Sequence, residues 1–137
     1  MDKIQKKEVI LVKRYLSLLL LAFTGIFFNY SFASADAING QAVFNNTNVG
    51  NCKSCHDTGD KKRVGPGLKG ITDRASKEWI TKWLEDTQAV WDANDSYTQD
   101  LKKRVKKEGK PKSAHKTPVK LTAEQITDVI DYLATFK

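Results

Sequence analysis

Both cysteines of this 137-residue chain and one of its two histidines lie within five residues, in the run Cys52-Lys53-Ser54-Cys55-His56. Cys-x-x-Cys-His is the signature by which c-type haem is attached to protein. Two thiols three positions apart lie on one side of a helical turn, where both can bond covalently to the vinyl groups of the porphyrin. The adjacent His56 then lies beneath the iron as its proximal ligand. The motif predicts one covalent haem c, attached through Cys52 and Cys55.

Two other chemistries use the same residue types. A redox-active disulfide of the Cys-x-x-Cys kind belongs to a βαβ setting, and the sequence pattern contains no such setting. Zinc would require Cys52, Cys55, the adjacent His56 and the distant His115, but no second compact pair of ligands is present. Haem therefore fits the motif better than a disulfide or zinc does.

The first 35 residues have the features of a targeting segment. Its basic side chains are Lys3, Lys6, Lys7, Lys13 and Arg14. An apolar run from Tyr15 to Phe28 follows, and Ala33-Ser34-Ala35 gives the small-x-small pattern that precedes cleavage. The run is shorter than the roughly 20 residues of a transmembrane helix. We predict that 1–35 is a cleaved signal peptide and that the mature protein is periplasmic or otherwise exported from the cytoplasm. A retained membrane anchor is the alternative.

Cleavage after Ala35 would subtract 35 residues from 137 and leave 102, at 36–137, enough for one small domain. The net charge is +7, of which the first 35 residues contribute +3 and the rest +4. Between Lys102 and Lys120 there are nine basic residues and one acid, Glu108. This stretch either solvates an exposed face or docks an acidic redox partner, because opposite charge raises the rate of encounter. Nucleic acid is a poor partner for an exported haem protein.

The hydrophobic pattern predicts an all-α domain of about four to five short helices. A domain this small buries a limited core from side chains alone, so a haem would supply apolar surface for packing. The clearest helix follows Thr122, with an apolar face of Ile126, Val129, Ile130 and Leu133. The other predicted helices cover 38–45, 76–87 and about twelve residues from Ser96, ending before a C′ glycine, Gly109.

Capping residues predict where these helices begin. Ser76 is the expected N-cap of the helix over 76–87. The runs 96–99 and 122–125 both have the pattern of a capping box. Glu85 and Asp86 lie at the C-terminal end of the helix predicted over 76–87. The helix dipole disfavours negative charge at that end, so we expect the helix to fray there.

Glycine and proline interrupt the chain after the haem motif, at Gly59, Gly65, Pro66, Gly67 and Gly70, and exclude a regular helix. Here the sequence resembles class I cytochromes c. Their Gly-x-x-x-Phe element is matched by Gly40 and Phe44, and their Gly-Pro-x-Leu element by the run 65–68. The run 74–84 also resembles the third helix of bacterial members. The resemblance covers essentially the whole mature chain and implies the cytochrome c fold, with helices wrapped around one haem.

The resemblance also implies roles for particular residues. In the family a proline carbonyl accepts a hydrogen bond from the proximal histidine, and a leucine packs on the haem; Pro66 and Leu68 match these positions. Such a carbonyl fixes the orientation of the ring and raises its basicity. The first and last helices cross in the family where a glycine meets an aromatic residue, and Gly40 and Tyr132 match that pair.

Two tryptophans, Trp79 and Trp83, lie on the apolar stripe of the helix predicted over 76–87, and we expect both in the haem pocket. The simpler interpretation is that both pack in the core. The alternative, as in some relatives, is that one indole N–H donates to a haem propionate, because buried indoles generally find a hydrogen-bond partner.

The sixth iron ligand is where the chain departs from the family, whose members usually offer a methionine on the loop before the last helix. The single methionine here is Met1, in the targeting segment. His115 stands at the expected position, three residues before Pro118 and seven before Thr122. We predict bis-histidine ligation by His56 and His115. The alternatives are a surface His115 that leaves the iron five-coordinate, or a lysine ligand at high pH. The candidate lysines are Lys112 and Lys116.

Ligand type predicts the chemistry. Methionine–histidine ligation raises the haem potential, and an imidazole in place of the thioether should lower it. Two protein ligands leave no open position for a substrate, which favours one-electron transfer between redox partner proteins over enzymatic catalysis. The alternatives are a gas-binding (NO or CO) or peroxidatic protein with a displaceable distal ligand, and a haem subunit of a larger redox complex, whether a hetero- or a homo-oligomer.

Overall fold

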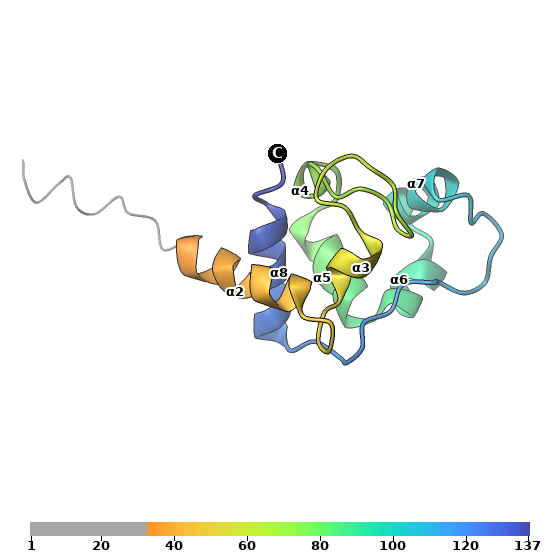
Figure 1. The fold of residues 1–137 in the computed structure, drawn as a ribbon. Coiled ribbons are helices and arrows are strands. Elements are labelled where there is room, and N and C mark those ends of the chain that lie inside the picture. Colours follow the sequence, from red (N-terminus) through yellow and green to blue (C-terminus); the bar gives the residue numbers. More distant parts are fainter. Residues whose placement is uncertain (1–32) are drawn as a thin grey trace, which may run out of the picture. The chain divides into compact units, whose positions relative to one another are not determined.

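A computed structural model describes residues 33–137 of the chain (Figure 1). The described residues form seven helices and no strand, which confirms the all-α class. In chain order the helices are α2 (Ala33–Asn45), α3 (Cys52–Cys55), α4 (Ile71–Arg74), α5 (Lys77–Glu85), α6 (Thr87–Ala93), α7 (Ser96–Arg104) and α8 (Ala123–Leu133). The predicted signal peptide lies outside the described residues except at 33–35, where α2 begins. Within the described range, no helix is both long enough and apolar enough to cross a membrane.

Helices α2 and α8 cross, and Figure 1 shows α2 lying over α8. A Cβ atom on Gly40 would lie 1.9 Å from the carbonyl oxygen of Asp128 and 2.8 Å from the Cβ of Tyr132. Glycine is therefore required at this point, because any side chain would push the two helices apart. The predicted contact between Gly40 and Tyr132 is confirmed. Helix α2 begins at Ala33, five residues before the predicted start at Ile38.

The core is built on the α2–α8 crossing. Phe44 is 1% exposed and meets Tyr132 and Phe136 edge to face, with ring centroids 5.4 and 5.9 Å apart. Such edge-to-face pairs add about 0.5–1.5 kcal/mol each beyond the area they bury. The predicted apolar face of the last helix is buried in this core: Ile126, Val129, Ile130 and Leu133. The capping box at Thr122 and Gln125 is present as predicted.

The helix predicted over 76–87 is two helices. Ser76 caps α5, since its hydroxyl accepts a hydrogen bond from the Trp79 amide at 3.1 Å. Helix α5 ends at Glu85, where fraying was expected, but the chain continues as α6. The carboxylate of Asp86 accepts a hydrogen bond from the Ala89 amide at 3.0 Å and caps α6. An acid at the unfavourable end of one helix thus lies at the favourable end of the next.

Both predicted ends of α7 are wrong. The N-cap is Asp95, whose carboxylate accepts from the Thr98 amide at 2.7 Å, so the capping box at 96–99 does not form. The helix ends at Arg104 because Lys106 adopts a left-handed conformation, with φ of 56°. Its amide and the amide of the next residue donate to carbonyl groups in the last turn, at 3.0 and 2.8 Å. A left-handed residue with these two hydrogen bonds ends a helix. Gly109 lies in the loop beyond it, also with a positive φ.

Candidate functional site

A cavity of about 580 Å³ lies within the domain, and its size suits a bound organic group. Its walls come from segments far apart in the sequence. They include α3, the loop 57–70 between α3 and α4, which we call the glycine-rich loop, and also α5, α7 and the loop before α8. All eight predicted site residues line it: Cys52, Cys55, His56, Pro66, Leu68, Trp79, Trp83 and His115. The sequence therefore identified residues that the fold brings to one place.

The two cysteines lie at the ends of α3, a single helical turn. The His56 amide donates to the Cys52 carbonyl oxygen at 2.9 Å and closes the turn, while the extended backbone of His56 carries its ring out of the helix. Burial raises the pKa of the Cys52 thiol to about 11. Redox-active Cys-x-x-Cys pairs instead have a lowered thiol pKa. The described residues also contain no strand, so the βαβ setting of a redox disulfide is absent there.

The ring of His56 is held from one side by the glycine-rich loop. Its Nδ1 lies 2.9 Å from the carbonyl oxygen of Pro66, which is the contact that the resemblance implies. The loop is itself fixed to the haem motif, because the Gly65 amide donates to the Cys55 carbonyl oxygen at 2.8 Å. Donation from Nδ1 to a carbonyl selects one tautomer and leaves Nε2 free to bind a metal.

The ring of His115 is held in the same manner by a different partner. Its Nδ1 lies 3.2 Å from Oγ1 of Thr87, and that hydroxyl donates its hydrogen to the Trp83 carbonyl oxygen at 2.7 Å. A hydroxyl has one hydrogen to donate, so towards His115 it must accept. Nδ1 of His115 therefore carries the proton, and Nε2 is again free.

The two imidazoles face the same space. Their ring centroids lie 6.1 Å apart, and the ring planes are inclined by 50°. Two imidazoles that bind one metal from opposite sides, through bonds of about 2 Å, have ring centres roughly 6–6.5 Å apart. Burial lowers the pKa of both rings, and the pKa of His115 falls to about 4 with a further contribution from the charge of His56. Both imidazoles are therefore in the neutral form that ligates metals.

The two tryptophans have different surroundings. The indole N–H of Trp79 donates to Oγ1 of Thr98 at 3.2 Å, so this indole is satisfied by the protein rather than by a propionate. Trp83 stacks on Trp79, with centroids 4.9 Å apart, and its ring centroid lies 5.5 Å from that of His115. Trp83 thus forms the wall of the cavity beside the second imidazole.

Tyr97 and Thr87 are site residues that the sequence did not reveal. Tyr97 lines the cavity beside the Arg104 guanidinium, and its buried hydroxyl makes no hydrogen bond of normal geometry among residues 33–137. An orphaned buried hydroxyl normally pairs with something that occupies the site, and a haem carboxylate would satisfy it. Two thiols, two free imidazole nitrogens and this phenol together fit a covalent haem. In the sequence Tyr97 is one more residue of the helix predicted from Ser96. An isolated threonine likewise gives no signal.

The charged side chains that line the cavity are basic. Among the described residues that line it, six are basic and none is acidic. The basic residues, which we call the basic rim, are Lys62, Arg74, Arg104, Lys106, Lys107 and Lys116. Val64 also lines the cavity and is 80% exposed, so the cavity lining includes an exposed apolar side chain as well as the basic rim.

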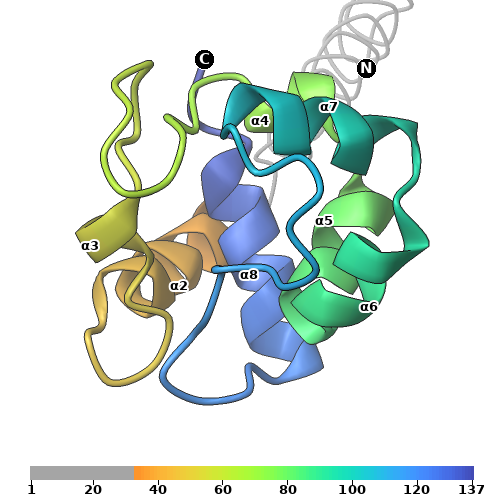
Figure 2. The ribbon, with the colours of Figure 1, turned by 90° about the vertical axis from the view of Figure 1, so that its right-hand side faces the viewer.

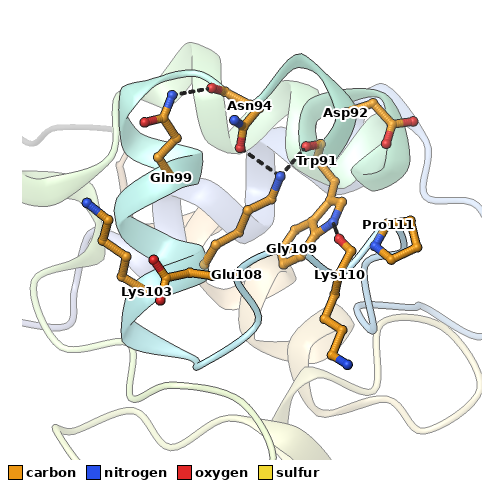
Figure 3. Close-up of a pocket in the computed structure, with 10 residues that line it drawn as sticks. Trp91, Asp92, Asn94, Gln99, Lys103, Glu108, Gly109, Lys110 and Pro111 are labelled. Atoms are coloured by element: carbon orange, nitrogen blue, oxygen red, sulfur yellow. Dashed lines mark hydrogen bonds between the residues drawn. The ribbon is translucent and has the colours of Figure 1, made fainter.

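Lys102 belongs to the basic stretch but not to the rim. Its ammonium group donates to the Trp91 carbonyl oxygen at 2.8 Å and to Oδ1 of Asn94 at 2.7 Å. The same group lies 4.6 Å from the centre of the Trp91 ring. These contacts border a second hollow of about 540 Å³ between α6, α7 and the loop that follows (Figure 3). The ammonium group of Lys102 therefore interacts with groups of the same domain.

The zinc alternative finds no support in the geometry. Across residues 33–137 there is no group of three or more His, Cys, Asp or Glu side chains placed to hold a metal ion. Two histidines on opposite sides of a cavity, by contrast, are the complete protein contribution to a six-coordinate haem iron.

The fold and the site define an all-α domain built around a covalently attached haem. The family model described as Cytochrome c matches residues 37–137, and the chain belongs to this family. Its cofactor is therefore haem c, one group for a domain of this size, and the family's chemistry is haem-based electron transfer. Comparison with curated proteins and with solved structures gives no match.

Proposed function

We propose that this protein is an exported monohaem cytochrome that carries single electrons between redox partners, with His56 and His115 as the two axial ligands. The observation that supports this most strongly is the 6.1 Å separation of the two ring centroids. In both rings Nδ1 is engaged by the protein, by Pro66 on one side and Thr87 on the other, so each presents Nε2.

The ligand pair predicts a low reduction potential. A methionine ligand raises the potential of a cytochrome c, and His115 replaces that thioether by a stronger donor to ferric iron. Two firmly held imidazoles leave no coordination position for a substrate or a gas. Electron transfer needs no such position, whereas peroxidatic or gas-binding chemistry does.

The location that we propose is a periplasm or an equivalent compartment outside the cytoplasm. Cytochrome c domains typically work there, and the basic, apolar and small-residue pattern of 1–35 is that of a cleaved signal peptide. The protein would be bound to a membrane only if that segment were retained.

The basic rim is the proposed docking surface for an acidic redox partner. Its residues line the cavity, so a partner held there would lie close to the haem, and opposite charge would raise the rate of encounter. Within the basic stretch the proposed docking residues are Lys106, Lys107 and Lys116, joined by Lys62 from the glycine-rich loop. The exposed Val64, which also lines the cavity, supplies an apolar contact.

Carbon monoxide binding to the reduced holoprotein tests this function. We expect the wild type to bind CO only at high concentration and His115→Ala to bind it readily, because the distal position is then open. Lys112→Ala serves as the loop control and should behave as the wild type. Ready CO binding by the wild type would overturn the carrier proposal in favour of a gas-binding or peroxidatic protein. If His115→Ala bound CO as weakly as the wild type, ligation of the iron by His115 would be refuted.

A further inference from the structure

We propose that α6 is a template that positions the distal ligand, and that Thr87 on this helix controls how strongly His115 donates to the iron. This inference rests on the proposed ligation by His115. The segment concerned is the distal loop, residues 105–121, which joins α7 to α8 without a helix or strand of its own. Figure 2 shows it leaving α7, passing beside α6 and continuing to α8. Loops of this length in a small domain are uncommon unless they are functional.

Thr87 holds the ligand itself. Its hydroxyl donates to the Trp83 carbonyl oxygen at 2.7 Å and faces Nδ1 of His115 at 3.2 Å. The carbonyl of α5 therefore fixes the direction of the hydroxyl, and the hydroxyl fixes the tautomer of the imidazole. A hydrogen bond that Nδ1 donates also raises the basicity of Nε2.

Gln88, the next residue of α6, holds the backbone that leads to the ligand. Its Nε2 donates to the Pro111 carbonyl oxygen at 3.0 Å, and its Oε1 accepts from the Ser113 amide at 3.1 Å. One side-chain amide thus pairs with two loop groups, much as a neighbouring strand would. The Ser113 hydroxyl then accepts from the His115 amide at 3.1 Å, which carries the restraint to the ligand.

Trp91 supplies the third anchor, one turn further along α6. Its indole N–H donates to the Lys110 carbonyl oxygen at 2.8 Å, as Figure 3 shows. Trp91 is 4% exposed, so this anchor is part of the packed interior. Residues i and i+4 of a helix lie on one face, and in α6 they are Thr87 and Trp91. A single face of α6 therefore fixes the distal loop at 110 and at 115.

The first test replaces Thr87 and measures the reduction potential of the holoprotein. Thr87→Val removes the acceptor for His115, whereas Thr87→Ser retains it. We expect Val to weaken the preference of the distal imidazole for ferric over ferrous iron about tenfold, the lower end of the usual effect of such partners. A tenfold change raises a one-electron potential by about 59 mV. Serine should restore the wild-type value.

The matched control is Thr81→Val on α5. The Thr81 hydroxyl donates to the carbonyl oxygen four residues earlier, at 2.9 Å, as that of Thr87 does, but it makes no hydrogen bond to the distal loop. Thr81→Val should leave the potential unchanged. If Thr87→Val and Thr81→Val gave the same potential, the control by Thr87 would be refuted. Thr87→Ala repeats the test should valine prevent folding.

The second test follows the distal loop by amide hydrogen exchange. Gln88→Ala should accelerate exchange of the Ser113 and His115 amides at least tenfold and increase CO binding to the reduced protein. Gln99→Ala, whose side chain donates to the Asn94 carbonyl oxygen at 2.9 Å, is the control and should do neither. Unchanged exchange in Gln88→Ala would overturn the template.

The two proposals fail separately. If His115→Ala leaves the spectra of the holoprotein unchanged, ligation by His115 is refuted and the present inference falls with it. If His115→Ala changes the spectra while Thr87→Val behaves as Thr81→Val does, His115 remains the ligand and only the control by Thr87 is refuted.

Discussion

The rings of His56 and His115 lie 6.1 Å apart, centre to centre, although they belong to different loops and are held by unrelated groups. A backbone carbonyl, that of Pro66, orients the first. A side-chain hydroxyl, that of Thr87, orients the second. The common result is an unprotonated Nε2 on each side of one cavity, which is the arrangement that a haem iron with two histidine ligands requires.

The first prediction concerns the space beside the proximal ring. A Cβ atom at Gly65 would lie 2.4 Å from Cε1 of His56, so Gly65→Ala must displace the imidazole. We expect the ferric holoprotein to acquire a high-spin fraction, measured by its optical spectrum. Gly59→Ala is the control. The nearest atom to a Cβ at Gly59 would be Oδ1 of Asp57, at 3.0 Å. A fully low-spin Gly65→Ala protein would show that the ring is not constrained there.

Much of the site could be predicted from the sequence because its chemistry is local. The attachment residues and His56 lie in one short motif, and Pro66 belongs to a second. His115 was identifiable because it is the one other histidine and precedes the last helix. Thr87 could not be found in this way, since its role depends on the break between α5 and α6, and a single hydroxyl in a helix is usually exposed.

The second prediction concerns the crossing of α2 and α8. Gly40→Ala places a methyl group against the Asp128 carbonyl oxygen, at 1.9 Å if nothing moves. Overpacking of this kind costs about 1–3 kcal/mol, which outweighs the roughly 1 kcal/mol that alanine contributes to an isolated helix. Denaturant unfolding of the holoprotein should show a net loss of stability. Gln41→Ala, at an exposed position of the same helix, should be nearly neutral, and equal stability of the two variants would contradict the close crossing.

The helix ends were harder to predict than the core, for a physical reason. Apolar periodicity identified the buried face of α8 because burial dominates the free energy of its residues. The ends of α7 depend on two competing local choices, whether Asp95 or the following serine caps it and which residue turns left-handed. Each choice changes the free energy by only about 1 kcal/mol. At the C-terminal end the left-handed residue that ends the helix is Lys106 rather than Gly109.

The third prediction separates Lys102 from the other lysines of the basic stretch. Lys102→Met removes two hydrogen bonds and the contact with the Trp91 ring, so the protein should lose about 1–3 kcal/mol of stability. Its electron-transfer rate with anionic oxidants should change little beyond the loss of one charge. Lys103→Met, an exposed neighbour, should leave stability within about 0.5 kcal/mol of the wild type. A Lys102→Met protein as stable as Lys103→Met would refute the structural role.

The fourth prediction tests the basic rim with small redox reagents. Lys107→Glu should slow electron exchange with ferricyanide several-fold and accelerate exchange with hexaammineruthenium, because it reverses a charge at the cavity. Both effects should fade as salt screens the charge. Lys120→Glu has the same formal charge change outside the rim and should have a smaller effect. Equal effects of the two variants would mean that net charge, rather than the rim, governs the encounter.

The most direct test of ligation by His56 and His115 is the low-temperature EPR spectrum of the ferric holoprotein, compared with that of His115→Ala. Two imidazole ligands make ferric haem low-spin, so the wild type should give a low-spin signal alone and His115→Ala a high-spin one. A high-spin signal from the wild type at neutral pH, or a low-spin signal that persists unchanged in His115→Ala, would contradict ligation by His56 and His115.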